Sequence, residues 1–215
     1  AGVVTQAGAG VSHVKEGDEV WGCAGGFKGL PSGALAEFIL TDAQLVSLKP
    51  KNLSFPQAAA LPLVGLTAWF SIIDRAKVSD GDLVLVHAGC GGVGHVGIQL
   101  AKQQGAIVHT TVSNREKADL AKGLGADETI LYPGLSVEDY VTEYTDGLGY
   151  NVVYDTVGSS NLDASFEAAR FGGKIINIAA RSSHNLAPMH AKGLTLHVVF
   201  LVAMVANPKN RYTIQ

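Results

Sequence analysis

The chain has 215 residues, of which 47% are apolar, 16% are charged and 26 are glycine, and its formal net charge is −3. This composition excludes a disordered or low-complexity chain, and the charge balance leaves no basic surface for nucleic acid or an anionic membrane. The longest apolar run, residues 194–206, is too short to span a bilayer. We therefore expect neither a nucleic-acid nor a membrane partner.

The chain has two cysteines, Cys23 and Cys90, which lie 67 positions apart. They form no disulfide framework, which is typical of a reducing compartment, so we expect a cytoplasmic protein. The chain begins without an initiator methionine or a basic leader segment and ends without a helix stop or a polar tail. We therefore expect it to be cut from a longer protein.

Short apolar runs separated by glycine-rich turns dominate residues 1–53. This pattern predicts an all-β segment with a barrel-like arrangement. The predicted strands are residues 3–4, 19–21, 35–40 and 45–48.

Two helical stretches are expected next. Ser54 has the character of an N-cap, and Pro56 suits the first turn of the helix that follows. A second stretch is expected after Pro62, through Trp69 to Arg75.

From Leu83 onward, apolar runs of strand length alternate with helical segments about every 20 to 25 residues. Continuous apolar strands that alternate with helices indicate parallel strands buried on both faces. The fold class predicted here is therefore α/β, a doubly wound parallel sheet of the Rossmann type. The predicted strands are residues 83–87, 107–112, 129–131, 152–154 and 174–179, and the predicted helices are residues 93–104, 115–124, 137–144 and 162–169.

A G-x-G-x-x-G pattern at Gly89, Gly91 and Gly94 directly follows the first of these strands and opens a helix. In this context the pattern is typical of a dinucleotide-binding loop. Gly89 is expected to allow a tight turn, Gly91 to let the backbone approach a pyrophosphate, and Gly94 to let the helix pack closely on the strand. A purely structural turn and a methyltransferase-type loop remain alternatives.

The end of the second strand bears on the choice of nucleotide. An NAD site places an acidic residue there, as a methyltransferase does, whereas residues 109–114 contain none. Hydroxyl and amide groups are followed by Arg115 and Lys117, which suits the 2′-phosphate of NADP(H). The alternative is that Arg115, Glu116 and Lys117 only begin a solvated helix.

The sequence contains no recognisable metal-binding or nucleophile motif that would support another chemistry. The seven histidines show no paired spacing, and no C-x₂-C unit occurs, so a structural zinc lobe is not expected. No G-x-S-x-G elbow occurs either. Cys90 at the start of a helix is either an activated thiol or a small residue tolerated beside phosphates, and we favour the second interpretation.

Residues 61–69 and the glycine-rich run 84–102 resemble the quinone oxidoreductase (zeta-crystallin-like) branch of the medium-chain dehydrogenase/reductase superfamily. Further similarities lie at residues 17–22, 124–127 and 154–158. The resemblance implies a partial GroES-like catalytic domain in residues 1–54. It implies an NADP(H)-binding Rossmann domain, with its connecting helix, in residues 55–215.

The same resemblance implies roles for individual residues. The cofactor-binding loop would comprise Gly89, Cys90, Gly91, Gly92, Val93 and Gly94, with Gly91, Gly92 and Val93 at the pyrophosphate. Ser113, Lys117 and Tyr132 would contact the 2′-phosphate, although Tyr132 also suits a rim aromatic. Thr67, Val157, Ile178 and Phe200 would line the nicotinamide end, although Phe200 also suits ordinary core.

Asp155 ends a strand above the expected crevice, where it either acts on a ribose or caps a turn. No proton donor or other catalytic residue is identified. The family's zinc enzymes carry cysteines near residues 22–27 and 62–65, where this chain has only Cys23, so no metal is expected. The apolar runs 175–179 and 194–202 are expected at a sheet edge, which implies a homodimer.

The expected function is zinc-independent, NADPH-dependent reduction of a small quinone or enone substrate. Three alternatives remain: a zinc-type alcohol dehydrogenase relative, an enoyl-thioester reductase, and a non-enzymatic NADPH-binding protein of a crystallin-like or RNA-associated kind.

Overall fold

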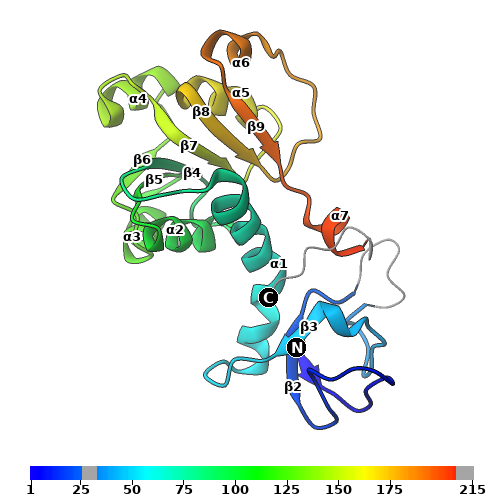
Figure 1. Cartoon of the computed structure of the whole chain (residues 1–215). Helices are drawn as coiled ribbons and strands as arrows, with labels where there is room; N and C mark the ends of the chain where they lie inside the picture. The colour runs from blue at the N-terminus through cyan, green and yellow to red at the C-terminus, as the bar shows by residue number, and fades with distance from the viewer. Residues whose placement is uncertain (26–32, 207–215) are drawn as a thin grey trace. The chain divides into compact units, whose positions relative to one another are not determined.

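A computed structural model describes residues 1–25 and 33–206 of the chain. The chain forms two compact units, one from Ala1–Leu66 and Phe200–Gln215 and the other from Thr67–Val199 (Figure 1). The predicted assignment of residues 1–54 to a GroES-like domain and 55–215 to a nucleotide-binding domain stays a prediction.

The first unit contains a three-stranded antiparallel sheet in the order β1 (Gly2–Val3), β2 (Glu19–Gly22), β3 (Val46–Leu48). The strand predicted at residues 35–40 is wrong, because this segment forms bends and coil with Leu35 and Phe38 largely exposed. A strand is stable only where a neighbour completes its hydrogen-bond ladder, and none of the described strands pairs with this segment. The three strands form an open sheet, and Leu45 ends a short 3₁₀-helix (Ala43–Leu45) instead of starting a strand.

The helix predicted at Ser54 begins as expected. The Ser54 amide donates to Gln57 Oε1 over 3.0 Å, and the Gln57 amide donates back to Ser54 Oγ over 3.5 Å, which is a capping box. The predicted break at Pro62 is wrong. Helix α1 (Phe55–Trp69) runs through Pro62 and continues as a π-helical segment, η2 (Phe70–Ala76), because the loss of one amide hydrogen bond does not outweigh the bonds on either side of it.

The continuous helix over residues 55–76 is long and apolar enough to cross a bilayer. Length and composition alone are weak grounds, since core helices of soluble proteins meet the same criterion. The expectation of no membrane partner stays a prediction.

The second unit is built on a six-stranded parallel sheet in the order β6-β5-β4-β7-β8-β9. Numbered within this unit, the order is 3-2-1-4-5-6, which is that of the Rossmann fold, so the predicted fold class is confirmed. The strand order reverses between β4 and β7, since β5 and β6 extend the sheet on one side of β4 and β7, β8 and β9 extend it on the other. The strands are β4 (Leu83–His87), β5 (Ile107–Val112), β6 (Glu128–Leu131), β7 (Tyr150–Asp155), β8 (Ala169–Asn177) and β9 (Thr195–Val198).

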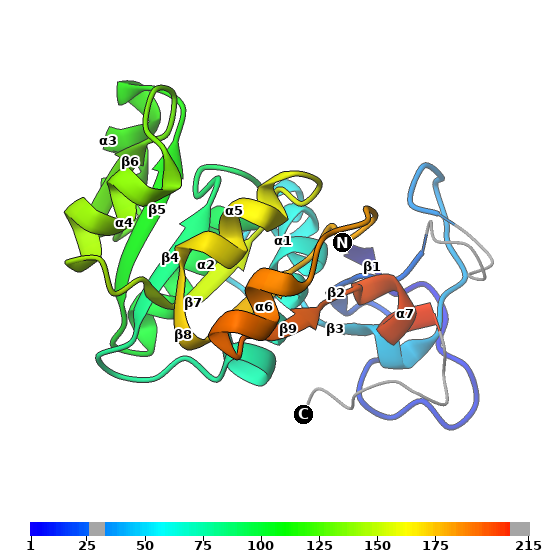
Figure 2. The same ribbon diagram turned by 90° about the horizontal axis from the view of Figure 1, so that it is seen from above.

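Helices cover both faces of this sheet. Segments η2, α2 (Gly94–Gln103) and α3 (Arg115–Gly123) lie on one face, and α4, α5 and α6 lie on the other (Figures 1 and 2). On the second face, Leu162 and Phe166 of α5 pack on Leu85, Val153 and Ile175 in a buried hydrophobic cluster. The bounds of the remaining helices are α4 (Val137–Thr145), α5 (Asn161–Ala168), α6 (Ala187–Lys192) and, in the first unit, α7 (Leu201–Ala206).

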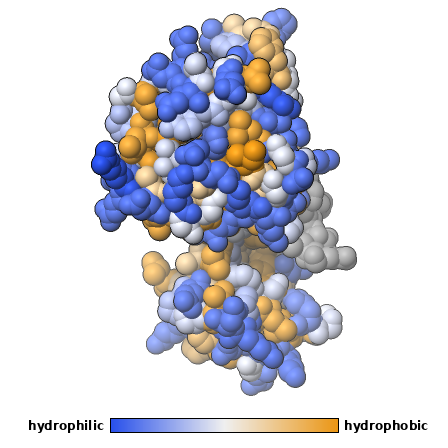
Figure 3. Space-filling model, turned by 90° about the vertical axis from the view of Figure 1, so that its left-hand side faces the viewer, coloured by the Kyte–Doolittle hydropathy of each residue, from blue (hydrophilic) through white to orange (hydrophobic). Residues whose placement is uncertain are grey.

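The predicted strands and helices of residues 83–179 all occur, with ends shifted by a few residues. The largest shift is in β8, which begins at Ala169 because a register shift in its pairing with β7 adds residues at its start. The apolar run 194–206 divides into β9 and α7, so β9 forms the sheet edge and β8 lies inside the sheet. Figure 3 views the side that carries α3 and α4, where hydrophilic atoms predominate and apolar atoms form separate patches.

We predict that Gly97→Ala destabilises the protein by about 1–3 kcal/mol, because a Cβ there would lie 2.7 Å from the fully buried ring of Tyr154. Gly123→Ala is the matched control, since a Cβ at this helical glycine meets nothing within 4 Å. Alanine is the better helix former, so the control should be neutral or slightly stabilising. Urea unfolding of both variants measures the difference, and equal stabilities would contradict the close packing of α2 on β7.

Candidate functional site

The loop after β4 is held by two hydroxyl groups of β5. Thr110 Oγ1 donates to the Val86 carbonyl over 2.7 Å and accepts from the Gly89 amide over 3.0 Å. Thr111 Oγ1 accepts from the Ala88 amide over 3.1 Å. Both threonines are buried, so their hydroxyls need partners, and the loop backbone supplies them.

The glycines of this loop are required for space. A Cβ on Gly89 would lie 2.1 Å from Thr110 Oγ1, and one on Gly94 would lie 2.3 Å from the Ala88 carbonyl oxygen. The close approach at Gly94 is to the loop backbone at Ala88 and Gly89, so the packing of helix on strand predicted for this glycine stays a prediction. The tight turn predicted for Gly89 is present, because the Gly91 amide donates to the Ala88 carbonyl over 2.8 Å around Gly89 and Cys90. The left-handed residue here is Ala88, whose φ of 55° is strained for a residue with a side chain.

The start of α2 has the properties of an anion site. The first amides of a helix have no partner within the helix and carry its positive dipole end. The N-cap residue, Val93, offers no capping side chain, and the first turn holds no acidic residue. Gly91 and Gly92 are exposed, so a ligand can reach this loop. The loop therefore fits a pyrophosphate.

Cys90 is not an activated thiol. Its Sγ donates to the Lys117 carbonyl over 3.1 Å, which links the loop to α3. Burial raises the pKa of the Cys90 thiol, and this effect outweighs the opposing charge of Lys117. Of the two interpretations of Cys90, the structure favours a small residue beside the loop.

A second group of polar side chains follows the ends of β5 and β6. Lys117 Nζ donates to Ser113 Oγ over 3.1 Å, and Asn114 caps α3 by accepting from the Lys117 amide over 2.9 Å. Tyr132, half-exposed, follows β6 directly and its amide donates to the Val112 carbonyl. An ammonium, a hydroxyl and a phenol thus lie at two neighbouring strand ends, which fits a phosphate.

The four residues expected at the nicotinamide end are distributed differently. Val157 and Ile178 follow the neighbouring strands β7 and β8, and the Ile178 amide donates to the Asp155 carbonyl. Thr67 is buried in α1, where its carbonyl accepts from Ser71. Phe200 is half-exposed and belongs to the first unit, so it is not brought together with the others within one unit.

Asp155 shapes the ends of β7 and β8. Its Oδ1 accepts from the amides of Val157 and Gly158 over 3.0 and 2.9 Å and from Asn161 Nδ2 over 2.8 Å. Its Oδ2 accepts from Asn177 Nδ2 over 2.7 Å. Since the carboxylate is fully buried and used on both oxygens, it caps the turn, and the alternative of a ribose contact is not supported.

His87 is a buried imidazole under the glycine loop. Its Nδ1 lies 3.3 Å from Thr111 Oγ1, and its Nε2 has no hydrogen-bond partner in the part of the chain that the structure describes. Burial lowers the pKa of His87 from 6.5 to about 4, although the charge of Asp155 opposes the shift. The imidazole is therefore neutral at pH 7.

The sequence did not identify Thr110 and Thr111 of β5 as functional residues. Their signal was two consecutive hydroxyl residues near the carboxyl end of a strand buried on both faces, where each hydroxyl must find a partner. Asp163, Ser182 and His184 were also missed; their hydrogen bonds are described below.

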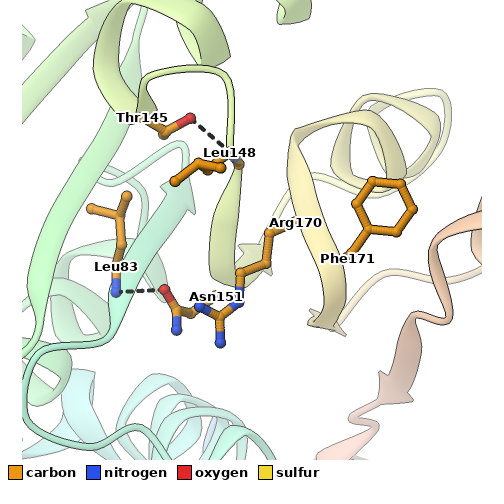
Figure 4. A pocket seen from close by; sticks show the side chains of 7 residues that line it. Leu83, Thr145, Leu148, Asn151, Arg170 and Phe171 are labelled. Carbon is orange, nitrogen blue, oxygen red and sulfur yellow. Dashed lines mark hydrogen bonds between the residues drawn. The ribbon is translucent and has the colours of Figure 1, made fainter.

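A pocket of about 380 Å³ lies at the opposite end of the strands, where β4 and β7 begin (Figure 4). Leu83 and Asn151 lie at the amino ends of β4 and β7, and the Leu83 amide donates to Asn151 Oδ1 over 3.2 Å. Ligands of open parallel sheets bind at the carboxyl ends, so this pocket is separate from the candidate site. Its lining residues are Leu83, Thr145, Leu148, Gly149, Asn151, Arg170 and Phe171.

A metal centre does not assemble within residues 1–25 and 33–206. No group of three histidine, cysteine or acidic side chains comes together there. Cys23 is a buried free thiol whose pKa is raised by burial. These residues do not fit a zinc site, and we derive no step through zinc.

Solved structures with similar folds are described as dehydrogenase, oxidoreductase or reductase proteins. An alcohol dehydrogenase superfamily protein from Novosphingobium aromaticivorans has a TM-score of 0.90 at 40% identity, over 95% of this chain and 61% of that chain. The Escherichia coli quinone oxidoreductase complexed with NADPH has a TM-score of 0.84 at 29% identity, over 97% and 64%. CurK enoyl reductase has a TM-score of 0.82 at 27% identity, over 97% and 62%.

The curated relatives are much longer proteins. A mycocerosic acid synthase-like polyketide synthase of Mycobacterium tuberculosis is 34% identical over 187 residues, which are 86% of this chain and 8% of the synthase. The chain thus spans about a tenth or less of the curated relatives it matches first, and less than two thirds of the solved structures above.

The sheet order and the glycine loop define a dehydrogenase-type nucleotide-binding fold. The family model described as zinc-binding dehydrogenase matches residues 92–212, so the chain belongs to this family of medium-chain dehydrogenases/reductases. The narrower resemblance to the quinone oxidoreductase branch is not confirmed, because the curated relatives include polyketide synthases.

We predict that acidification destabilises the protein through His87. Between pH 6.5 and 4 the unfolded imidazole binds a proton that the native one does not, so stability falls as pH decreases, by up to about 3 kcal/mol from this group. His109 and His197 shift in the same direction, so the comparison is with the variant His87→Gln.

Urea unfolding at pH 7 and pH 4.5 measures the loss of stability that comes from His87. His87→Gln should lose less stability on acidification than the unsubstituted protein, and His190→Gln, an exposed control, should not differ from it. Equal pH dependence in all three proteins would contradict a neutral buried His87.

Proposed function

We propose that the chain is the nucleotide-binding part of a zinc-independent reductase that uses NADPH to reduce quinones or activated alkenes. The observation that carries this proposal is the combination of the glycine loop at the start of α2 with the Ser113–Lys117 pair at the end of β5. The two anion sites belong to consecutive strand–helix connections of one Rossmann sheet, which suits a phosphorylated dinucleotide.

NADPH is favoured over NADH by charge. A 2′-phosphate is stabilised by an ammonium and a hydroxyl, and a carboxylate at the same place would repel it. Ser113 and Lys117 supply the first two groups, and the segment from Val112 to Asn114 holds no carboxylate. A bound reduced nicotinamide supplies a hydride, and the chain's own groups bind and orient it.

Two classes of acceptor have support. The E. coli relative is described as a quinone oxidoreductase, and CurK as an enoyl reductase. The polyketide synthase relatives favour an enoyl thioester among the activated alkenes, because the acyl chains of such synthases are carried as thioesters. A zinc-type alcohol dehydrogenase activity is less well supported, because the described side chains assemble no metal site.

We also propose a homodimer in the cytoplasm. Strand β9 is an edge strand of the sheet and Val198 at its end is half-exposed, so a second copy can continue the sheet there. Free Cys23 and Cys90 suit a reducing compartment.

We predict that Lys117→Ala weakens NADPH binding by about 1–3 kcal/mol and leaves NADH binding unchanged, because only NADPH carries the phosphate that Lys117 would contact. The control is Lys122→Ala in the same helix, whose ammonium instead pairs with Glu128. Fluorescence titration with both nucleotides measures the effect. An equal loss for NADPH and NADH would contradict the phosphate site.

We predict turnover of NADPH with a soluble benzoquinone or with a crotonyl thioester, without dependence on added zinc or inhibition by a chelator. The measurement is NADPH oxidation at 340 nm with each acceptor, together with metal analysis of the protein. Stoichiometric zinc with alcohol oxidation would favour the alcohol dehydrogenase alternative, and NADPH binding without reduction of either acceptor would favour a non-enzymatic protein.

A further inference from the structure

Three polar side chains form a connected chain beside the carboxyl ends of β7 and β8. His184 Nδ1 lies 2.8 Å from Asp163 Oδ1, and His184 Nε2 lies 2.5 Å from Ser182 Oγ. Asp163 is in the first turn of α5, which follows β7, and the other two residues are in the loop between β8 and α6. A hydroxyl, an imidazole and a carboxylate in this order are the elements of a proton relay.

The surroundings fix the imidazole and leave both ends of the relay accessible. The side chain of His184 is 8% exposed, and its ring meets the Phe166 ring edge to face at 6.2 Å. The side chain of Asp163 is 54% exposed, and Ser182 is exposed. Solvent can therefore supply protons to the relay, while the packed ring keeps its orientation.

The relay lies at the ligand-binding edge of the sheet. Rossmann sheets bind their ligands beyond the carboxyl ends of the strands, and Asp155 and Asn177 end β7 and β8 as paired neighbours. Ser182 is four residues after Ile178, which directly follows β8. The Cα atoms of Ile178 and Ser182 are therefore at most about 14 Å apart. Neither Ser182 nor His184 is used by the Asp155 network.

Reduction of an activated alkene needs a proton on carbon. A bound reduced nicotinamide would supply a hydride to the β-carbon, which would leave the displaced electron pair on the carbonyl as an enolate. The α-carbon must then receive a proton. In quinone reduction both protons end on oxygen, where water delivers them without help.

We propose that Ser182, His184 and Asp163 deliver the proton to the α-carbon of an activated alkene, an inference that rests on the proposed reductase function. Ser182 Oγ–H gives its proton to the enolate carbon while the His184 imidazolium passes the Nε2 proton to the same oxygen. Asp163 holds the Nδ1–H and stabilises the imidazolium charge. A proton from bulk solvent then restores the imidazolium, so the reaction consumes one hydride and one solvent proton for each alkene.

The test compares two acceptors in Ser182→Ala, His184→Gln and Asp163→Asn, with Ser183→Ala as the matched control. The acceptors are a benzoquinone and an enoyl thioester with an α-methyl group. Turnover of the thioester should fall about 10²- to 10⁴-fold in Ser182→Ala and His184→Gln, and by a smaller factor in Asp163→Asn, whereas quinone turnover should change less than about twofold.

Two further readouts separate a relay from a structural contact. The residual thioester product of Ser182→Ala should lose its single configuration at the α-carbon, because solvent then protonates both faces. In the cofactor-free protein, nitrogen-15 NMR should detect a slowly exchanging His184 Nδ1–H that Asp163→Asn loses.

Equal losses with both acceptors, unimpaired thioester reduction in Ser182→Ala and His184→Gln, or the absence of the protected Nδ1–H would each overturn the relay while leaving the reductase proposal intact. Quinone reduction without thioester reduction by the unsubstituted protein would also overturn it. Reduction of neither acceptor by the unsubstituted protein would overturn the proposed function, and the relay with it.

Discussion

The Thr110 hydroxyl on β5 is the contact on which the candidate site depends. It donates to the Val86 carbonyl at the end of β4 and accepts from the Gly89 amide, so it fixes where the strand stops and where the loop begins. The same oxygen occupies the space that a Cβ on Gly89 would need. With Gly89 fixed and Ala88 held in a left-handed conformation, α2 can begin at Gly94 with its amino end toward the carboxyl edge of the sheet.

The other strand ends follow the same physical rule. Parallel strands release the chain at one edge, and the backbone polar groups there need partners. Asp155 and Asn177 supply them for β7 and β8, and Asn114 caps the helix after β5. Asp155 and Asn177 are buried and occupied in this way, so ligand binding is left to the more accessible side chains of these connections, among them Ser113, Lys117 and Ser182.

Local sequence patterns were sufficient to predict much of the second unit. The period of apolar residues identified β4 to β8, and the glycine loop could be found because its backbone demands are local. Tertiary contacts decided the rest. Residues 35–40 have strand-like composition, but no described strand pairs with them. Pro62 is accommodated inside a long apolar helix. The carboxylate of Asp155 binds backbone amides of the turn after β7. The approach of His184 to Asp163 joins residues 21 positions apart, which no local spacing encodes.

The central claim is that the loop of residues 88–93 binds the pyrophosphate of NADPH while Ser113 and Lys117 bind its 2′-phosphate. A crystal structure of the protein with NADPH tests it most directly. We predict pyrophosphate oxygens within hydrogen-bond distance of the Gly92 and Val93 amides, and phosphate oxygens within that distance of Ser113 Oγ and Lys117 Nζ. A nucleotide bound elsewhere, or one whose 2′-phosphate faces solvent away from Lys117, would contradict the account.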